Sequence, residues 1–266
     1  MTVELKRLME RVSRYLLVSL LVLIPAAAAA QTLEFNFEDP VQIAATETPG
    51  DWYPDRFAPC GFVSPAIAPD HSVYTLEESI CASDHQPYPA DSFYNTQGRK
   101  YDLIANTYSV SISLYVPKSW GTTNGRMAGF WATAFDSSNV VGDYPIIEFQ
   151  GPITSDAGGP GYDPNGGVAG FYGWDNTVGA FTLIGLPPGF KYNSWVELTM
   201  TLMPGKGFVY TVTSLNHKKG LSLKTGFSDL TDATLGNVIL QGYNYDTSYN
   251  IYWNDLNFSF NSLFCK

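Results

Sequence analysis

The stretch 144–150 places a carboxylate and an amide on one side of a predicted strand. Side chains alternate along a strand, so Glu148 and Gln150 lie opposite Ile147 and Phe149. Carboxylates and amides accept and donate hydrogen bonds to sugar hydroxyls, and this pair therefore favours carbohydrate binding. The alternative is that Glu148 is a hydrogen-bonded polar residue on a solvated strand face.

Aromatic side chains provide the second chemical signal. Trp131, Tyr172 and Trp174 lie on alternating strands, and the last two share a face of their segment. Sugar rings present flat C–H faces that stack on Trp and Tyr. Trp120 and Trp253 are further candidates. The alternative is burial, because large aromatic residues also fill the cores of β-sandwiches.

The elements that must position these residues are strands. Alternation with a period of two recurs along the chain, whereas no long helical period occurs after the N-terminal segment. The predicted strands are 33–38, 107–116, 126–135, 144–150, 167–174, 179–184, 194–203, 206–213, 237–243 and 249–260. So many strands favour two packed antiparallel sheets in one domain, 31–266. Residues 40–100 are rich in proline and are expected to form long loops around one or two short strands.

Three cysteines follow the N-terminal segment, and their pairing bears on the loop-rich region. Cys60 and Cys81 enclose a stretch rich in Pro and Ser, and a bridge between them would pin a long loop. Cys265 would then remain free or form an intermolecular bridge. A bridge from Cys265 to either of the other two is the alternative, because sequence alone does not determine the connectivity.

The first 30 residues have the order of a secretory signal peptide. Four basic residues precede the apolar run 15–24, and Pro25 and five alanines lead to a cleavage site before Gln31. The run is too short for a membrane span, which needs about 20 residues. We therefore expect a secreted protein, extracellular or periplasmic, with no membrane span after processing.

The charge of the processed chain excludes one class of partner. Removal of residues 1–30 leaves 11 Lys and Arg against 23 Asp and Glu, a net charge of −12. Such a surface repels phosphate backbones, so nucleic acid is not an expected partner. It suits hard cations such as calcium, or neutral polymers.

Several phrases of the sequence resemble a known fold family. The terminal strands are LEFNFED (33–39) and YNIYWNDLNFSF (249–260). The middle phrases are FYNTQGRKYDL (93–103), RMAGFWATAFDSSN (126–139), DYPIIEFQ (143–150) and LPPGFKYNSWVELTMTL (186–202). Together they are similar to concanavalin A-like, laminin G-like jelly rolls, and to secreted bacterial proteins of that fold without an assigned activity.

The resemblance has two implications for the site. Glucanases of this fold carry E-x-D-x-x-E, and Glu148 matches its first carboxylate. Gln150 replaces the Asp and Ile153 replaces the second Glu, so the carboxylate pair of a retaining hydrolase is missing and no catalytic residue is assigned.

The second implication is a structural calcium ion where the first and last strands meet. The matching residues are Glu38, Asp39 and Asp255, whose carboxylates suit this cation. Another candidate cage is Asp136, Asn139 and Asp143. Ordinary turn chemistry of Asp and Asn is the alternative at both places.

The leading hypothesis is a secreted, non-catalytic β-sandwich that binds a polysaccharide or other glycan, or acts as a surface or matrix module. Its recognition face would be the concave sheet, with Trp131, Glu148, Gln150, Tyr172 and Trp174. The alternatives are a polysaccharide-degrading hydrolase or lyase with an unidentified carboxylate arrangement, and a structural or adhesive extracellular protein. The sequence makes no prediction of the oligomeric state.

Overall fold

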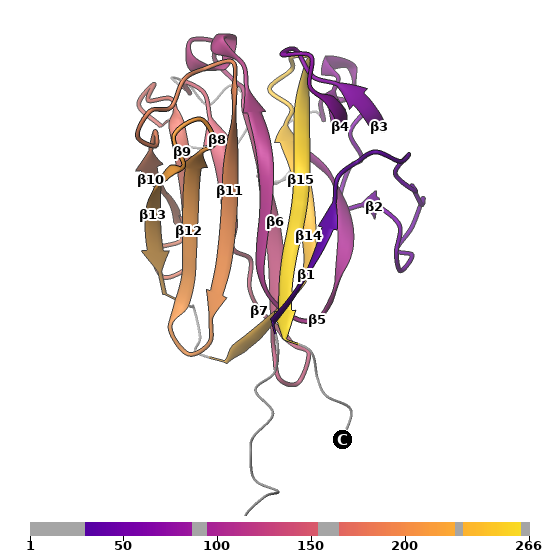
Figure 1. Cartoon of the computed structure of the whole chain (residues 1–266), viewed down its shortest axis with the longest axis vertical. Helices are drawn as coiled ribbons and strands as arrows, with labels where there is room; N and C mark the ends of the chain where they lie inside the picture. Colours follow the sequence, from indigo (N-terminus) through magenta and orange to yellow (C-terminus); the bar gives the residue numbers. More distant parts are fainter. Residues whose placement is uncertain (1–29, 87–94, 154–164, 227–230, 262–266) are drawn as a thin grey trace, which may run out of the picture. The chain divides into compact units, whose positions relative to one another are not determined.

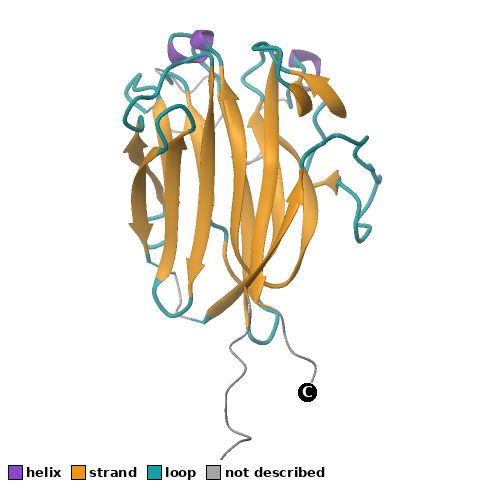
Figure 2. Cartoon of the chain, viewed as in Figure 1, coloured by secondary structure: helices purple, strands orange, loops and turns teal. Residues whose placement is uncertain are grey.

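The computed structural model describes residues 30–86, 95–153, 165–226 and 231–261. Residues Ala30–Asn261 form one compact unit built of two layers of antiparallel strands (Figure 1). In the described ranges, helical structure consists of two short 3-10 turns, η1 (Ala82–Asp84) and η2 (Lys118–Gly121) (Figure 2). None of the helices described there is long and apolar enough to cross a membrane. The predicted signal peptide and Cys265 lie outside the described residues, apart from Ala30.

The first sheet has six main strands in the spatial order β10-β9-β8-β6-β14-β5. Their bounds are β10 (Ala180–Gly185), β9 (Gly170–Asp175), β8 (Ile146–Gln150), β6 (Met127–Asp136), β14 (Asp232–Tyr243) and β5 (Thr96–Val116). Two short strands, β7 (Val141–Asp143) and β2 (Tyr53–Pro54), pair with β6 and β5.

The second sheet shares β5 with the first. Residues 96–102 of β5 pair with β14, whereas residues 109–116 pair with β11 on one side and largely with β15 on the other. The strands of this sheet are β11 (Ser194–Met203), β12 (Gly207–Ser214), β13 (Lys219–Thr225), β15 (Tyr249–Asn261), β1 (Ala30–Phe35), β4 (Val73–Ile80) and β3 (Gly61–Ile67). The long strand β5 therefore connects the two layers.

The core lies between the sheets and follows the alternation of the sequence. In β5, Val110, Ile112 and Leu114 are fully buried, and Ile147 and Phe149 of β8 join the same apolar cluster. Burial of these faces away from water is the main favourable term that holds the two sheets together. The prediction of an all-β sandwich of two antiparallel sheets is confirmed.

The prediction of long loops around one or two short strands over residues 40–100 was incomplete. This region contains β2, β3, β4 and the start of β5. Ser64, Thr75 and Glu78 are polar residues on buried positions of β3 and β4, and they conceal the apolar alternation that would have identified these strands. Strand β13 was also missed.

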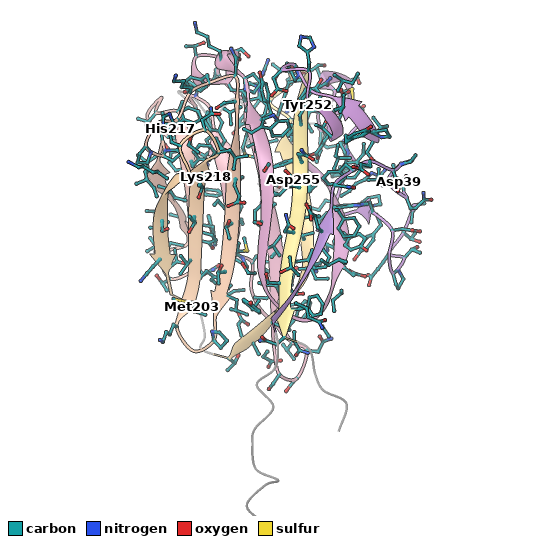
Figure 3. All side chains as sticks on the ribbon, viewed as in Figure 1. Asp39, Met203, His217, Lys218, Tyr252 and Asp255 are labelled. Atoms are coloured by element: carbon teal, nitrogen blue, oxygen red, sulfur yellow. A yellow bond between two sulfur atoms is a disulfide. The ribbon has the colours of Figure 1, made fainter. Side chains whose placement is uncertain are left out.

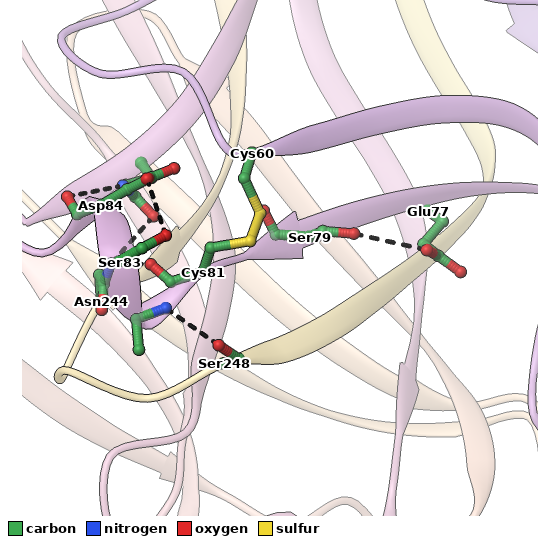
Figure 4. Close-up of a disulfide and its surroundings, with 10 residues drawn as sticks. Cys60, Glu77, Ser79, Cys81, Ser83, Asp84, Asn244 and Ser248 are labelled. Atoms are coloured by element: carbon green, nitrogen blue, oxygen red, sulfur yellow. Dashed lines mark hydrogen bonds between the residues drawn. A yellow bond between two sulfur atoms is a disulfide. The ribbon is translucent and has the colours of Figure 1, made fainter.

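The predicted bridge between Cys60 and Cys81 is confirmed, with 5.9 Å between the two Cα atoms. Cys60 precedes β3 and Cys81 follows β4, so the disulfide closes the open end of a hairpin (Figure 4). Asn244 donates a 2.7 Å hydrogen bond to the carbonyl of Cys81, and Ser248 accepts one from the N–H of Ala82. These bonds attach the bridged end of the hairpin to the segment between β14 and β15.

Candidate functional site

The outer face of the first sheet, which points away from the core, carries a small apolar cluster of its own. Trp131 of β6, Ile146 of β8 and Ile239 of β14 are buried together there, and Trp174 and Phe181 pack against them. Adjacent strands place these side chains in one row, because Trp131 pairs with both Ile146 and Ile239. Trp131, Ile146 and Trp174 of this cluster line the first of two adjoining pockets.

The first pocket, called the aromatic pocket here, has a volume of about 380 Å³. Its lining includes Trp131, Trp174, Tyr144, Arg56, Asp143 and Asn176. The guanidinium of Arg56 lies 5.2 Å from the centre of the Trp131 ring, and Trp174 meets Phe181 edge-on. The Nδ2 of Asn176 is buried at this pocket without a hydrogen-bond partner. The pocket thus combines two indoles with an amide donor.

The second pocket, called the polar pocket, has a volume of about 770 Å³. Its lining includes Tyr53, Lys100, Asp102, Thr133, Tyr144 and Asn237. Tyr53 donates a 2.6 Å hydrogen bond to Oδ1 of Asp102, and Thr133 donates one of 2.9 Å to Oδ1 of Asn237.

Those two bonds leave hydrogen-bonding atoms at the polar pocket. Within the described residues, no hydrogen bond involves Oδ2 of Asp102 or Nδ2 of Asn237. Asp102 and Asn237 are paired across β5 and β14, so the acceptor and the donor come from neighbouring strands. This arrangement suits a hydroxyl, which both accepts and donates hydrogen bonds.

Tyr144 connects the two pockets. Its side chain lines both of them and is 50% exposed, an unusual exposure for so large an aromatic residue. We call the aromatic pocket, Tyr144 and the polar pocket together the groove.

A short edge segment, residues 52–57, holds one side of the groove. The N–H of Asp55 donates to the carbonyl of Gly98, and the N–H of Gly98 donates to that of Phe57. Tyr53 reaches Asp102, and Asp55 forms ion pairs of 3.0 Å with both Lys100 and Arg56. The segment therefore positions side chains at both pockets.

The protonation of Tyr53 follows from its surroundings. Burial, followed by the hydrogen bond to the Asp102 carboxylate and its charge, raises the pKa of Tyr53 far above the ordinary value of 10.0. The phenol therefore remains a hydrogen-bond donor at physiological pH.

Glu148 and Gln150 do not lie at the groove, and the expectation that they form an open binding surface was wrong. Glu148 is fully buried and Gln150 is 3% exposed. Gln150 donates a 2.7 Å hydrogen bond to Oε1 of Glu148, and Gln241 donates one of 3.4 Å to Oε2. Gly129 makes room for this network, because a Cβ there would overlap that of Glu148. The network ties β8 to β14 across β6.

The predicted aromatic residues divide into two groups. Trp131 and Trp174 are brought together in the aromatic pocket. Tyr172 is 6% exposed and donates a 2.9 Å hydrogen bond to the carbonyl of Val168, so it packs within the sheet. Trp120 and Trp253 belong to the core between the sheets.

The carboxylates predicted to share calcium are not brought together. Figure 3 shows Asp255 on β15, at the middle of the sheet, and Asp39 on the loop after β1, far to one side. Burial and the nearby charge of Glu34 raise the pKa of Asp255. In the described ranges, the group of three potential metal ligands within 4.8 Å is Cys60, Cys81 and Asp84, whose two sulfurs form the disulfide. The structure thus gives no shared ligand set at Glu38, Asp39 and Asp255.

The second candidate cage shows ordinary turn chemistry. Oδ1 of Asp136 accepts 2.8 Å hydrogen bonds from the N–H groups of Ser138 and Val140. Asp136 and Asn139 lie at the polar pocket, whereas Asp143 lies at the aromatic pocket.

Several groove residues escaped the sequence analysis. Lys100 and Asp102 alternate at the start of β5, which was assigned to the loop-rich region or left without a strand. Tyr144 could have been found, because it lies on the same face as Glu148 in the strand that was predicted over 144–150. Tyr53 comes from a strand of two residues that has no sequence signal.

Comparisons with known proteins concern the fold. No family model matches the sequence, and no curated protein matches it. Among solved structures, the alginate lyase Aly36B is 10% identical, with a TM-score of 0.48 over 85% of this chain and 96% of that one. Lectin II from Ulex europaeus is 14% identical, with a TM-score of 0.45 over 87% of this chain and 99% of that one. A protein of unknown function from Shewanella oneidensis is 9% identical, with a TM-score of 0.47 over 96% and 95% of the two chains. The TM-scores of these three matches all lie below 0.5, so the matches carry no conclusion about the family or the ligand of this protein.

Proposed function

We propose that this protein binds carbohydrate in the groove, as a secreted module without catalytic activity. The observation that carries the proposal is the meeting of two accessible aromatic residues, Trp174 and Tyr144, with polar atoms in one recess whose lining also includes the buried Trp131. Aromatic rings stack on the apolar faces of sugars, and fixed polar groups bind their hydroxyls.

The polar pocket supplies the hydroxyl contacts. Oδ2 of Asp102 is an acceptor and Nδ2 of Asn237 is a donor, and both atoms have no other hydrogen bond among the described residues. Rigid strands carry both side chains, and this fixes their positions before a ligand arrives. Such preorganisation lowers the entropic cost of binding.

The state of Tyr53 opposes one catalytic role, that of a general base. A phenol acts as a general base only after it has lost its proton, and the raised pKa of Tyr53 opposes that loss. The hydrogen bond from Tyr53 occupies Oδ1 of Asp102 and leaves Oδ2 available as an acceptor.

Two assays on the same samples test the proposal. The purified protein is incubated with a panel of soluble and insoluble polysaccharides, and retention is measured by sedimentation and by affinity gel electrophoresis. New reducing ends and unsaturated uronates are measured in parallel. We expect retention by at least one polysaccharide without product. Release of oligosaccharides would favour the enzyme alternative, and no retention by any polymer would overturn the proposal.

A further inference from the structure

The charges around the groove point to the class of sugar, an inference that rests on the proposed function. Four carboxylates line the two pockets, namely Glu47, Asp102, Asp136 and Asp143. The cations of the described lining are Lys100 and Arg56, one in each pocket. The lining therefore carries an excess of negative charge.

Both cations already form ion pairs with one residue, Asp55. Asp55 places its two carboxylate oxygens 3.0 Å from Nζ of Lys100 and 3.0 Å from the guanidinium of Arg56. The Asp55 side chain is only 12% exposed, so water screens these ion pairs less than it would at an open surface. Arg56 also lies over the ring of Trp131. A uronate or sulfate in the groove would compete with Asp55 for these cations and would lie among the four carboxylates.

We infer that the groove selects uncharged, hydroxyl-rich glycans and rejects polyuronates and sulfated glycans. A neutral sugar can donate a hydroxyl proton to Asp102 and accept one from Asn237, whereas an acidic sugar brings its charge toward that of Asp102. Like charges placed together at an interface oppose binding. The net charge of the whole chain, −10, has the same sign and adds a long-range repulsion.

Asp55 has a specific part in this selection. Its removal would leave Lys100 and Arg56 without their shared counter-ion, and the groove would then offer two cations to an acidic ligand. Asp55→Asn keeps the size of the side chain and the hydrogen bond from its N–H to Gly98. The matched control is Glu197→Gln on β11. It removes the same charge from the second sheet, and Glu197 lines neither pocket.

The test compares one polymer in two charge states. The neutral polysaccharide that binds best is compared with the same polymer after its primary alcohols have been oxidised to carboxylates, at two salt concentrations. We expect the oxidised form to bind at least about tenfold more weakly at low salt, with a smaller difference at high salt because salt screens repulsion. If the oxidised polymer loses affinity only because a hydroxyl is missing, the difference in affinity would be the same at both salt concentrations. An unchanged difference would therefore overturn the inference.

Commercial alginate, polygalacturonate and chondroitin sulfate complete the panel. We expect the ratio of the affinity for acidic polymers to the affinity for the neutral polymer to be at least about tenfold higher for Asp55→Asn than for Glu197→Gln, with both variants folded by circular dichroism. Acidic polymers that bind the native protein as tightly as neutral ones would overturn the inference and leave the proposed function intact. If neither class binds, the proposed function itself fails.

Discussion

The hydroxyl of Tyr53 donates a 2.6 Å hydrogen bond to Oδ1 of Asp102, and this bond connects the edge segment to the floor of the polar pocket. A hydrogen bond to a charged group contributes about 1.5–3 kcal/mol when it is partly buried. Tyr53→Phe removes the bond without removing the ring. We expect the variant to lose about 1.5 kcal/mol of stability, or about 3–6 °C in melting temperature.

The control for this variant is Tyr74→Phe, because Tyr74 is 50% exposed and does not line the groove. Differential scanning calorimetry of both variants measures the effect. Equal melting temperatures for the two variants would show that the hydrogen bond between Tyr53 and Asp102 does not contribute to stability.

Glu148 is expected to act on stability rather than on binding. Oε1 and Oε2 of Glu148 accept hydrogen bonds from Gln150 and Gln241. In Glu148→Gln one acceptor becomes an NH₂ group, which faces a donor. We expect a loss of about 1–3 kcal/mol, the cost of a buried polar group left without a proper partner. Denaturant unfolding of this variant and of Glu197→Gln measures it, and identical midpoints would contradict the role given to the network.

The disulfide should stabilise the hairpin β3–β4 and its attachment. Cys60 and Cys81 are 21 residues apart. Closure of such a loop lowers the conformational entropy of the unfolded chain, and this stabilises the folded state by about 3 kcal/mol. The double variant Cys60→Ala/Cys81→Ala should therefore melt about 6–12 °C lower. Cys265→Ser serves as the control, since it leaves the bridge intact. A double variant that melts like the control would argue against this contribution.

A buried acid predicts the pH dependence of stability. Burial raises the pKa of Glu78 from 4.5 to about 8, although the indole N–H of Trp253 and the charge of Arg99 act in the opposite direction. The folded state therefore binds more protons than the unfolded state between these two values. The contribution of Glu78 is fully present below pH 4.5, and it is lost as the pH rises to about 8.

Glu78→Gln isolates this contribution from the other titrating groups. The stability of the variant relative to the native protein should rise steadily from pH 4.5 to pH 8, as measured by urea unfolding at several pH values. A difference that does not change with pH would show that Glu78 has an ordinary pKa.

Alternation of apolar residues was sufficient to predict the sandwich, because most strands bury one side against the core. The alternation failed to predict strands in which buried positions are polar, as at Glu78 in β4. Glu78 accepts a hydrogen bond from the indole of Trp253, which is 175 residues away in the sequence. The groove was harder to predict for a related reason. Tyr53 and Asp102 are 49 residues apart, and nothing in either local sequence indicates that they meet. Trp131, Tyr172 and Trp174 were proposed from their residue type and strand position, and of the three the two tryptophans line the aromatic pocket.

Isothermal titration calorimetry of two tryptophan variants tests the carbohydrate-binding groove most directly. Trp174 lines the aromatic pocket on β9, whereas Trp195 on β11 donates a hydrogen bond to Asp70 and lines neither pocket. Each variant is titrated with a neutral oligosaccharide from the polymer that the native protein retains. We predict that Trp174→Ala binds at least about tenfold more weakly, because it loses a stacking surface, and that Trp195→Ala binds like the native protein. Equal affinities for the two folded variants would contradict the placement of the binding site in this groove.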